Sequence, residues 1–211
     1  MSARKVSVGI SPRYRLFRRF MLGVVGGMLG LRVHGAENVP ASGALVVASN
    51  HRRYLDPVFI SMAVPRRLQW MGKKELFVPP LDRFFYLIGS FPVDRKGGGR
   101  AALRTALEYL SQGAALGIFP EGTRRRAYDP EEAPKSGAVM LAVRSGAPMI
   151  PVYIGEVPGP LGRLRGEGLE VYIGEAREIE RGTGGSGAYR AAADEILGEI
   201  YALPETFGEG E

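Results

Sequence analysis

The sequence predicts a single α/β domain with a largely parallel or mixed central sheet, flanked by helices and preceded by an N-terminal amphipathic helix. Short apolar runs alternate with helical patterns, which is typical of sheets with many parallel strands. With 211 residues, 45% of them hydrophobic, the chain can bury one sizeable core but is short for two domains. Six apolar runs are expected as strands: residues 44–49, 68–71, 90–93, 115–119, 149–154 and 169–173.

Helices are expected between these strands. The clearest covers residues 100–112, where Leu103, Leu107 and Leu110 share one face and Gly113 provides the stop. Further helices are expected at residues 81–88, 136–144 and 189–203, and a flexible link at 182–187. The predicted organisation is a basic amphipathic segment at residues 1–32, one domain at 33–203 and a frayed tail at 204–211.

The net charge of +6 is concentrated at the N-terminus. Residues 1–32 hold seven of the 28 basic side chains and none of the 22 acidic ones, so this segment carries +7 and the remainder −1. A helical projection of residues 14–31 places Arg15 and Arg19 opposite a largely apolar side, in line with four glycines. A basic helix with an apolar face suits the headgroup region of an anionic bilayer. The apolar side is formed by Phe17, Phe20, Met21, Val24, Met28 and Leu31.

Three other interpretations of this segment are a spanning helix, a signal peptide and a core-packing helix. The uncharged run at residues 20–31 has twelve residues, short of the ~20 that a spanning helix needs. A basic start followed by such a run is the layout of a signal peptide, but the run holds four glycines and Arg32 follows at once. A core-packing helix is the third interpretation, and the glycines could allow close packing on the domain.

One of the two histidines, His51, lies five positions before a carboxylate, Asp56, and follows the apolar run at 44–48. Five residues turn a regular helix through about 500°, so the pair needs a bend between them. Pro57 and an apolar segment at 58–64 follow, which predicts Asp56 as the N-cap of a helix. The carboxylate could then orient the imidazole and stabilise its protonated form. On spacing alone, an alternative stays open: Asp56 only caps its helix and His51 is a solvated loop residue.

Four motifs in order resemble those of the glycerolipid acyltransferase family, the lysophosphatidate acyltransferases. The first is N-H-x-x-x-x-D at residues 50–56, and the third is F-P-E-G-T-R at 119–124. The resemblance extends from about residue 33 to residue 153, and the order of the motifs argues against chance. The other similar segments are G-S-F-P-V-D-R at 89–95, I-P-V-Y at 150–153 and K-S-G-A at 135–138.

The resemblance implies a reaction at a membrane surface. A fatty acyl group would pass from a thioester, acyl-CoA or acyl carrier protein, to the 2-hydroxyl of 1-acylglycerol 3-phosphate (lysophosphatidate), giving phosphatidate in phospholipid biosynthesis. His51 would be the general base and Asp56 would orient it, with no acyl-enzyme, metal or other cofactor. The enzyme would be a monotopic or peripheral protein on the cytoplasmic side of the cell membrane.

The acceptor phosphate calls for basic groups at the ends of the strands, where open α/β sheets bind ligands. Arg95 and Arg124 are expected to converge there, because each guanidinium offers a planar fork to phosphate oxygens. Without its preceding motif, Arg124 would be interpreted as part of a solvated basic turn. Lys73 resembles a family position that often supplies another phosphate contact.

The third motif supplies three further candidate residues. Backbone amides near Gly122 and Thr123 could stabilise the oxyanion that develops on the thioester. Two roles stay open for Glu121: a hydrogen bond to the glycerol hydroxyl of the acceptor, or an ion pair with an arginine that holds the turn.

Other chemistries fit poorly. The sequence has no G-x-S-x-G elbow, no P-loop and no G-x-G-x-x-G fingerprint. It has no cysteine, which excludes a disulfide framework and a thiolate nucleophile, and two histidines alone argue against a catalytic zinc site. Two alternatives remain. One is an acyltransferase of the same fold acting on another lysolipid or a glycolipid. The other is a non-catalytic membrane- or nucleic-acid-binding module, which would have no use for His51, and no nucleic acid partner is expected.

Overall fold

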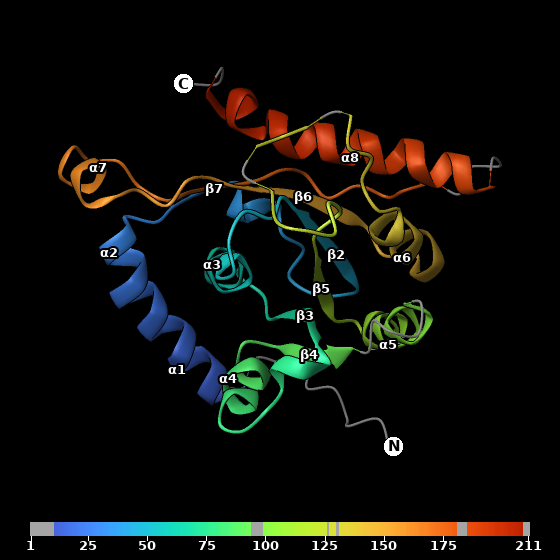
Figure 1. The fold of residues 1–211 in the computed structure, drawn as a ribbon, viewed down its shortest axis with the longest axis horizontal. Coiled ribbons are helices and arrows are strands. Elements are labelled where there is room, and N and C mark those ends of the chain that lie inside the picture. The colour runs from blue at the N-terminus through green and yellow to red at the C-terminus, as the bar shows by residue number, and fades with distance from the viewer. Residues whose placement is uncertain (1–10, 94–98, 126, 130, 181–184, 209–211) are drawn as a thin grey trace.

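A seven-stranded sheet forms the centre of the structure, a computed structural model that describes residues 11–93, 99–125, 127–129, 131–180 and 185–208 (Figure 1). The strand order is β1-β7-β6-β2-β5-β3-β4, with β6 and β7 antiparallel and the other neighbours parallel. The predicted α/β fold with a mixed sheet is confirmed. The strands are β1 (Arg32–His34), β2 (Leu45–Ser49), β3 (Leu68–Lys73), β4 (Ser90–Val93), β5 (Ala115–Ile118), β6 (Met149–Ile154) and β7 (Glu170–Ile173).

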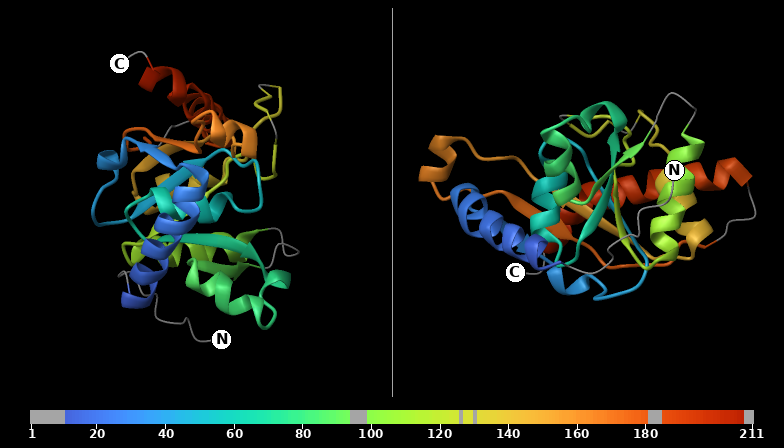
Figure 2. Two further views of the ribbon diagram at one scale, coloured as in Figure 1. Left: turned by 90° about the vertical axis from the view of Figure 1, so that its left-hand side faces the viewer. Right: turned by 90° about the horizontal axis from the view of Figure 1, so that it is seen from below.

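Helices cover both faces of the sheet (Figure 2). On one face lie α1 (Pro12–Met21), the π-helical turn η1 (Leu22–Gly26), α2 (Gly27–Leu29), α3 (Asp56–Ala63) and α4 (Leu81–Leu87). On the other lie α5 (Arg100–Ser111), α6 (Gly137–Ser145) and α8 (Gly185–Gly208). The short helix α7 (Pro160–Leu164) lies between β6 and β7 in the chain, and the 3₁₀ turns are η2 (Ala36–Asn38) and η3 (Lys74–Leu76).

The central strand β2 shows why the sheet needs two cores. All five of its residues are buried, because helices cover both faces of a parallel sheet. Side chains alternate along a strand, so Leu45 and Val47 join the core beneath α3 while Val46 and Ala48 join the core beneath α6 and α8. The polar residues that follow β2 are therefore anchored at the end of a rigid, fully packed strand.

Two elements differ from the expected ones. The helix α8 continues through Pro204 to Gly208, beyond the expected end at residue 203. Ring contacts of Phe207 with His34 and Tyr172 hold its last turn against β1 and β7. The expected link at residues 182–187 is helical from Gly185 onward, and residues 181–184 and 209–211 lie outside the described part. The three-residue strand β1 and helix α7 were not predicted, because each is too short to show a period.

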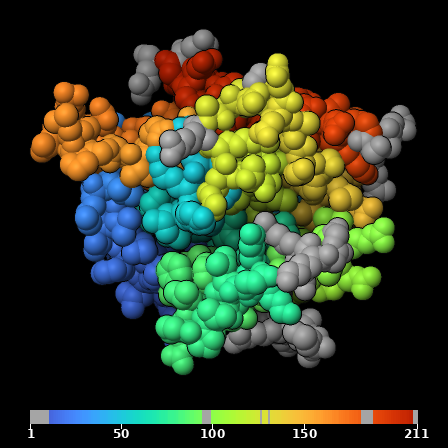
Figure 3. Space-filling view, in the orientation of Figure 1, coloured from blue at the N-terminus to red at the C-terminus, as the bar shows by residue number. Residues whose placement is uncertain are grey.

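The N-terminal helix, by which we mean α1, η1 and α2 together, has two apolar faces instead of the predicted one. Its inner face packs on the domain, and Tyr14 is only 1% exposed. Its outer face is exposed, and Figure 3 shows the helix along the left edge of the molecule, below α7. Of the glycines on the predicted glycine side, Gly26 is buried whereas Gly23 has open space beside it. The inner face is Phe17, Met21, Leu22, Val25, Leu29 and Leu31, and the outer face is Leu16, Phe20, Val24 and Met28.

None of the helices in the described residues is long and apolar enough to cross a membrane.

Candidate active site

The predicted site residues follow the carboxyl ends of neighbouring parallel strands. His51 lies two residues after β2, the third motif starts directly after β5, and Lys73 is the last residue of β3. The register pairs Ala48 with Ile118 and Lys73 with Val93, so these strands end at the same edge of the sheet. This edge is where open α/β sheets place ligand sites. Arg95 lies outside the described residues, two positions beyond the end of β4.

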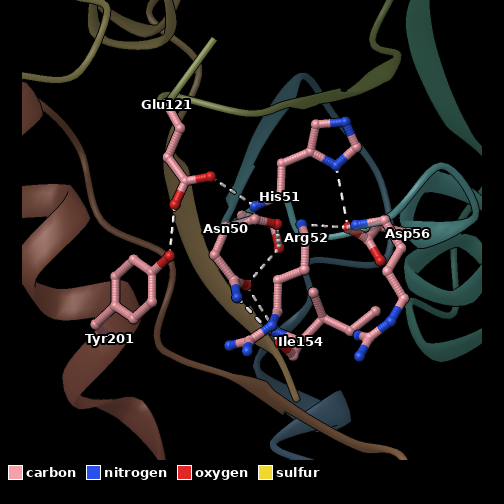
Figure 4. A network of polar contacts seen from close by, with 9 residues as sticks. Asn50, His51, Arg52, Asp56, Glu121, Ile154 and Tyr201 are labelled. Atoms are coloured by element: carbon pink, nitrogen blue, oxygen red, sulfur yellow. Dashed lines mark hydrogen bonds and ion pairs between the residues drawn. The ribbon is translucent and has the colours of Figure 1, made fainter. Parts of the chain in front are cut away.

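His51 and Asp56 contact each other through Nδ1 and Oδ2, 3.0 Å apart (Figure 4). Asp56 is fully buried, and only 16% of the His51 side chain is exposed. An ionised carboxylate can only accept hydrogen bonds, so His51 Nδ1 carries the hydrogen and Nε2 keeps its lone pair. His51 is therefore not a solvated loop residue, and Nε2 is the nitrogen that can take a proton.

Asp56 also folds the loop that carries His51. The backbone N–H groups of Arg52 and Arg53 both donate to its Oδ2, at 2.6 Å each. The helix α3 starts at Asp56 itself and Leu55 precedes it, so the predicted N-cap assignment is wrong. The carboxylate binds amides of the loop before the helix, which explains how a charged group can be buried here.

Aromatic rings fix the plane of the imidazole. The His51 ring stacks on Phe119 with 3.9 Å between centroids, and Phe119 in turn stacks on Trp70 at 5.0 Å. Trp70 donates from Nε1 to the hydroxyl of Ser61 on α3, at 2.9 Å. A Cβ at Gly117 would lie 2.5 Å from the Trp70 ring, so this strand position must be glycine. The sequence did not predict this stack, because its three rings come from separate segments of the chain.

Asn50, the residue before His51, joins two strand ends. Its side chain accepts a hydrogen bond from the N–H of Ile154 at 2.8 Å and donates to the Ile154 carbonyl at 3.0 Å. Asn50 is fully buried, so this paired bond satisfies groups that water cannot reach. The first motif is thereby tied to the end of β6, where the fourth motif lies.

Glu121 contacts the His51 loop and α8, and the described residues contain no ion pair between it and an arginine. Its Oε2 accepts the backbone N–H of His51 at 2.9 Å, and its Oε1 accepts the hydroxyl of Tyr201 on α8 at 2.5 Å (Figure 4). Glu121 is only 2% exposed. Burial raises the pKa of Glu121, while the hydrogen bonds from Tyr201 and His51 lower it in part. Burial and the bond to Glu121 also raise the pKa of the Tyr201 hydroxyl.

Tyr201 was not singled out from the sequence, because it lies 80 residues after Glu121. Its ring stacks on Tyr128, 4.6 Å between centroids, and meets the ring of Tyr153 edge-on at 5.8 Å. The C-terminal helix is thus held against the third motif by one hydrogen bond, and against Tyr128 and β6 by ring contacts. A tyrosine on the buried side of a late helix carries no local signal of this role.

The turn after β5 places Arg124 beside the His51 loop. The Arg125 N–H donates to the carbonyl of His51 at 2.7 Å, and the Arg124 guanidinium carbon lies 3.5 Å from the centroid of the Tyr54 ring. Arg124 is exposed and faces solvent at the rim of the site. Its guanidinium is therefore available to an incoming anion, while its position is held by the cation–π contact with Tyr54.

The turn itself depends on Gly122. Its φ is +69°, a left-handed conformation that glycine adopts without strain, and a Cβ there would meet Lys135 at 2.9 Å. The Gly122 N–H donates to the Phe119 carbonyl at 3.0 Å. This amide is therefore already engaged within the turn, which leaves the exposed Thr123 as the candidate amide for an oxyanion.

Two further arginines of the His51 loop are engaged by a protein carboxylate. Arg52 and Arg53 both form ion pairs with Glu156, two residues after β6. Burial raises the pKa of Glu156, but the interactions with the two arginines together outweigh this effect and lower it overall. The predicted phosphate contacts that remain exposed within the described residues are Arg124 and Lys73.

No group of three His, Cys, Asp or Glu side chains in the described part of the chain lies close enough to hold a metal ion.

The acyltransferase family model matches residues 30–155, which include His51, Asp56 and Glu121. The chain belongs to the acyltransferase family. It is 35% identical over 150 residues to the 1-acyl-sn-glycerol-3-phosphate acyltransferase of Bacillus subtilis (strain 168). The aligned segment covers 69% of this chain and 73% of that relative. Tyr201 lies outside the matched segment, although α8 brings it to the same site.

Two more comparisons place this acyltransferase. A probable 1-acyl-sn-glycerol-3-phosphate acyltransferase of Mycoplasma pneumoniae is 36% identical over 125 residues, covering 56% of this chain and 46% of that relative. The chain thus spans about half of its length. The crystal structure of the 1-acyl-sn-glycerophosphate acyltransferase PlsC from Thermotoga maritima has the same fold. Its TM-score is 0.64 at 22% identity, over 92% of this chain and 79% of that one.

Proposed function

We propose that this acyltransferase moves a fatty acyl group from acyl-CoA or acyl carrier protein to the 2-hydroxyl of 1-acylglycerol 3-phosphate, giving phosphatidate. The observation that carries the proposal is the contact between His51 and the buried Asp56, which leaves Nε2 as a base at the carboxyl ends of the strands. The names of the relatives from Bacillus subtilis and Mycoplasma pneumoniae support this choice of acceptor.

The reaction would need one base and no acyl-enzyme. His51 Nε2 takes the proton of the 2-hydroxyl as its oxygen attacks the thioester carbonyl, and Asp56 stabilises the imidazolium that forms. The tetrahedral intermediate then collapses, the carbon–sulfur bond breaks, and the leaving thiolate receives the proton from His51. The stack on Phe119 keeps the imidazole in one plane through both proton transfers.

The acceptor phosphate would be held at the rim. Arg124 in the turn after β5 and Lys73 at the end of β3 are exposed, and we place Arg95 with them on the basis of its motif. A guanidinium can bind two phosphate oxygens at once, whereas an ammonium acts as a point charge. The Thr123 amide would stabilise the oxyanion of the tetrahedral intermediate.

We further propose that the protein works as a peripheral or monotopic protein on the anionic cytoplasmic surface of the cell membrane. The outer face of the N-terminal helix supports this, because Phe20 and Met28 are 59% and 72% exposed beside the exposed Arg15 and Arg19. Exposed apolar side chains next to basic ones suit a helix that lies in the headgroup region.

The test is product analysis. Purified protein is mixed with acyl-CoA or acyl carrier protein and a panel of lysolipids: lysophosphatidate, other lysophospholipids, a lyso-ornithine lipid and a glycolipid. We expect phosphatidate to be the main product by mass spectrometry, and the His51→Ala variant to form none above background. A main product from an acceptor without a phosphate monoester would contradict the proposed acceptor and favour the alternative lysolipid or glycolipid substrate.

A further inference from the structure

The short helix α7 exposes two leucines that its fold does not use. Leu161 is 60% exposed and Leu164 is 86% exposed, the highest fraction among the exposed large hydrophobic residues of the described chain. Single exposed leucines are ordinary on protein surfaces. Two of them on one five-residue helix at the tip of a long connection call for a partner.

This helix is fastened to the end of the N-terminal helix. Arg163 donates from Nε to the Met28 carbonyl at 3.0 Å, and the Leu169 N–H donates to the Leu29 carbonyl at 3.0 Å. Gly30, with φ of +59°, lies beneath the Arg163 guanidinium, where a Cβ would come within 2.2 Å of a nitrogen. The end of α2 and the connection that carries α7 are thus held as one unit.

Both elements present their apolar side chains along one side of the molecule. The outer face of the N-terminal helix (Leu16, Phe20, Val24 and Met28) has one exposed residue every four positions, which forms a continuous stripe. The helix and α7 both lie toward the viewer in the left panel of Figure 2 and along the left edge in Figure 3. Because Arg163 donates to the Met28 carbonyl, α7 lies beside the end of this stripe.

The charges beside this surface favour an anionic lipid bilayer as its partner. Arg13, Arg15 and Arg19 are exposed on α1, and Arg165 is exposed directly after α7. Glu167 is an acidic neighbour, also exposed, so the balance of these exposed charges is positive. Apolar side chains that protrude from two elements among basic ones match a headgroup layer with acyl chains beneath it.

We infer that α7 is a second lipid-contact element, whose leucines insert into the bilayer surface beside the N-terminal helix. The inference rests on the proposed membrane association, which involves the N-terminal helix alone. It adds a second element, α7, that lies outside this helix and outside the residues 30–155 that the family model matches. Contact through both the N-terminal helix and α7 would fix how the domain is rotated on the membrane surface. This rotation would set the distance between the lipid and the edge of the sheet that carries His51.

The absence of cysteine makes a direct test possible, because a single introduced cysteine can be labelled cleanly. A fluorophore is attached in Leu164→Cys, in Phe20→Cys as the reference, and in Ser111→Cys as a control at the exposed end of α5. Each protein is mixed with phosphatidylglycerol vesicles that carry quenchers on their acyl chains. We expect quenching at residues 164 and 20 and none at residue 111.

The outcomes separate the inference from the proposed function. Quenching at residue 20 without quenching at residue 164 overturns the inference and leaves the N-terminal membrane contact intact. No quenching at either position overturns both the inference and the proposed membrane contact of the N-terminal helix. If the residue 164 label is shielded without vesicles and the protein sediments as a dimer, a second copy covers α7 and the inference fails.

A paired affinity measurement supports the label experiment. Replacing Leu161 and Leu164 by serine should weaken vesicle binding by roughly 10-fold or more, because two leucines lose their burial in lipid. Replacing both by isoleucine keeps the apolar area and should leave binding unchanged. Turnover of a soluble short-chain acceptor should be the same in all three proteins, and unchanged vesicle affinity in the serine variant would overturn the inference.

Discussion

The His51 loop and the outer face of the N-terminal helix are built in opposite ways. In the loop, the Asp56 carboxylate is fully buried and bound by three N–H donors, and the backbone of His51 is held by Glu121 and by Arg125. On the outer face, apolar side chains point into solvent. Proton transfer needs one fixed geometry, whereas contact with a fluid lipid surface needs accessible apolar area and charge. The difference predicts that changes in the two regions affect different measurements.

The largest effect is expected at His51. General-base assistance is typically worth ~10²- to 10⁴-fold in rate, so His51→Ala should lose at least ~10²-fold in kcat while remaining folded. His34→Ala is the matched control, because the other histidine pairs with Glu170 at the edge strand β1. It should keep its activity. Turnover of His51→Ala above a tenth of the parent rate would remove His51 from the mechanism.

Asp56→Asn separates orientation from charge. The amide cannot accept the Nδ1–H of His51 and two backbone N–H groups as the carboxylate does, so kcat should fall by ~10²-fold or more. The pH–rate profile of the residual activity is the informative readout, because the imidazolium has lost its countercharge. A profile and rate equal to those of the parent would show that Asp56 only shapes the loop.

The third prediction concerns the acceptor. Arg124→Lys keeps the charge but loses the planar fork, so the acceptor KM should rise by roughly 10-fold with little change for the donor. Arg144→Lys, on the exposed side of α6, is the control and should match the parent. Should the donor KM alone rise, Arg124 would belong to the phosphates of the donor.

A smaller effect is expected at Tyr201. Tyr201→Phe keeps the ring contacts and removes the hydrogen bond to Glu121, which should lower the free energy of unfolding by about 1.5–3 kcal/mol at neutral pH. The hydroxyl binds the ionised carboxylate and lowers the pKa of Glu121 in the folded protein, so its contribution exists above that pKa.

The direction in which this stability difference changes with pH can also be predicted. Burial keeps the pKa of Glu121 above the usual 4.5, so the stability difference between parent and Tyr201→Phe should shrink as the pH falls through that raised value. Urea unfolding at several pH values measures it, with Tyr128→Phe as the control that keeps the stack. A difference that does not change with pH would mean that the hydroxyl does not bind an ionised Glu121.

The fifth prediction addresses the exposed face. Each basic residue near an anionic surface contributes ~1 kcal/mol, and salt screens it over a Debye length of about 8 Å. Arg15→Glu with Arg19→Glu should therefore weaken vesicle binding mainly at low salt. Arg18 is a poorer choice, because its guanidinium donates to the Met62 carbonyl at 2.8 Å. Binding that is unchanged at both low and high salt would place the membrane contact elsewhere.

Patterns within one element could be predicted from the sequence, and pairings between distant elements could not. Six of the seven strands and the helix α5 follow from local runs and spacing, and the His51–Asp56 contact was one of the two alternatives that the spacing left open. The bond between Glu121 and Tyr201 joins residues 80 positions apart, and only the packing of α8 on β6 brings them together. The stack of His51, Phe119 and Trp70 likewise depends on the pairing of β3 with β5.

The N-terminal helix shows a second limit. A regular projection places Phe17 and Phe20 on one side, but in the structure Phe17 packs on the domain and Phe20 is exposed. The π-helical turn at Leu22–Gly26 also changes the period partway along the helix. The sequence indicates an apolar helix, but the docking surface decides which apolar residues are buried.

The most direct test of separate roles for these two regions measures both vesicle binding and turnover in two variants. One is His51→Ala, and the other replaces Phe20 and Val24 of the outer face by serine. Each is measured for binding to anionic vesicles and for turnover of a soluble short-chain lysophosphatidate. We predict that His51→Ala binds vesicles like the parent without turnover, and that the outer-face variant turns over the soluble acceptor with weakened vesicle binding. Loss of both vesicle binding and turnover in either variant would contradict the division of roles between the His51 loop and the outer face.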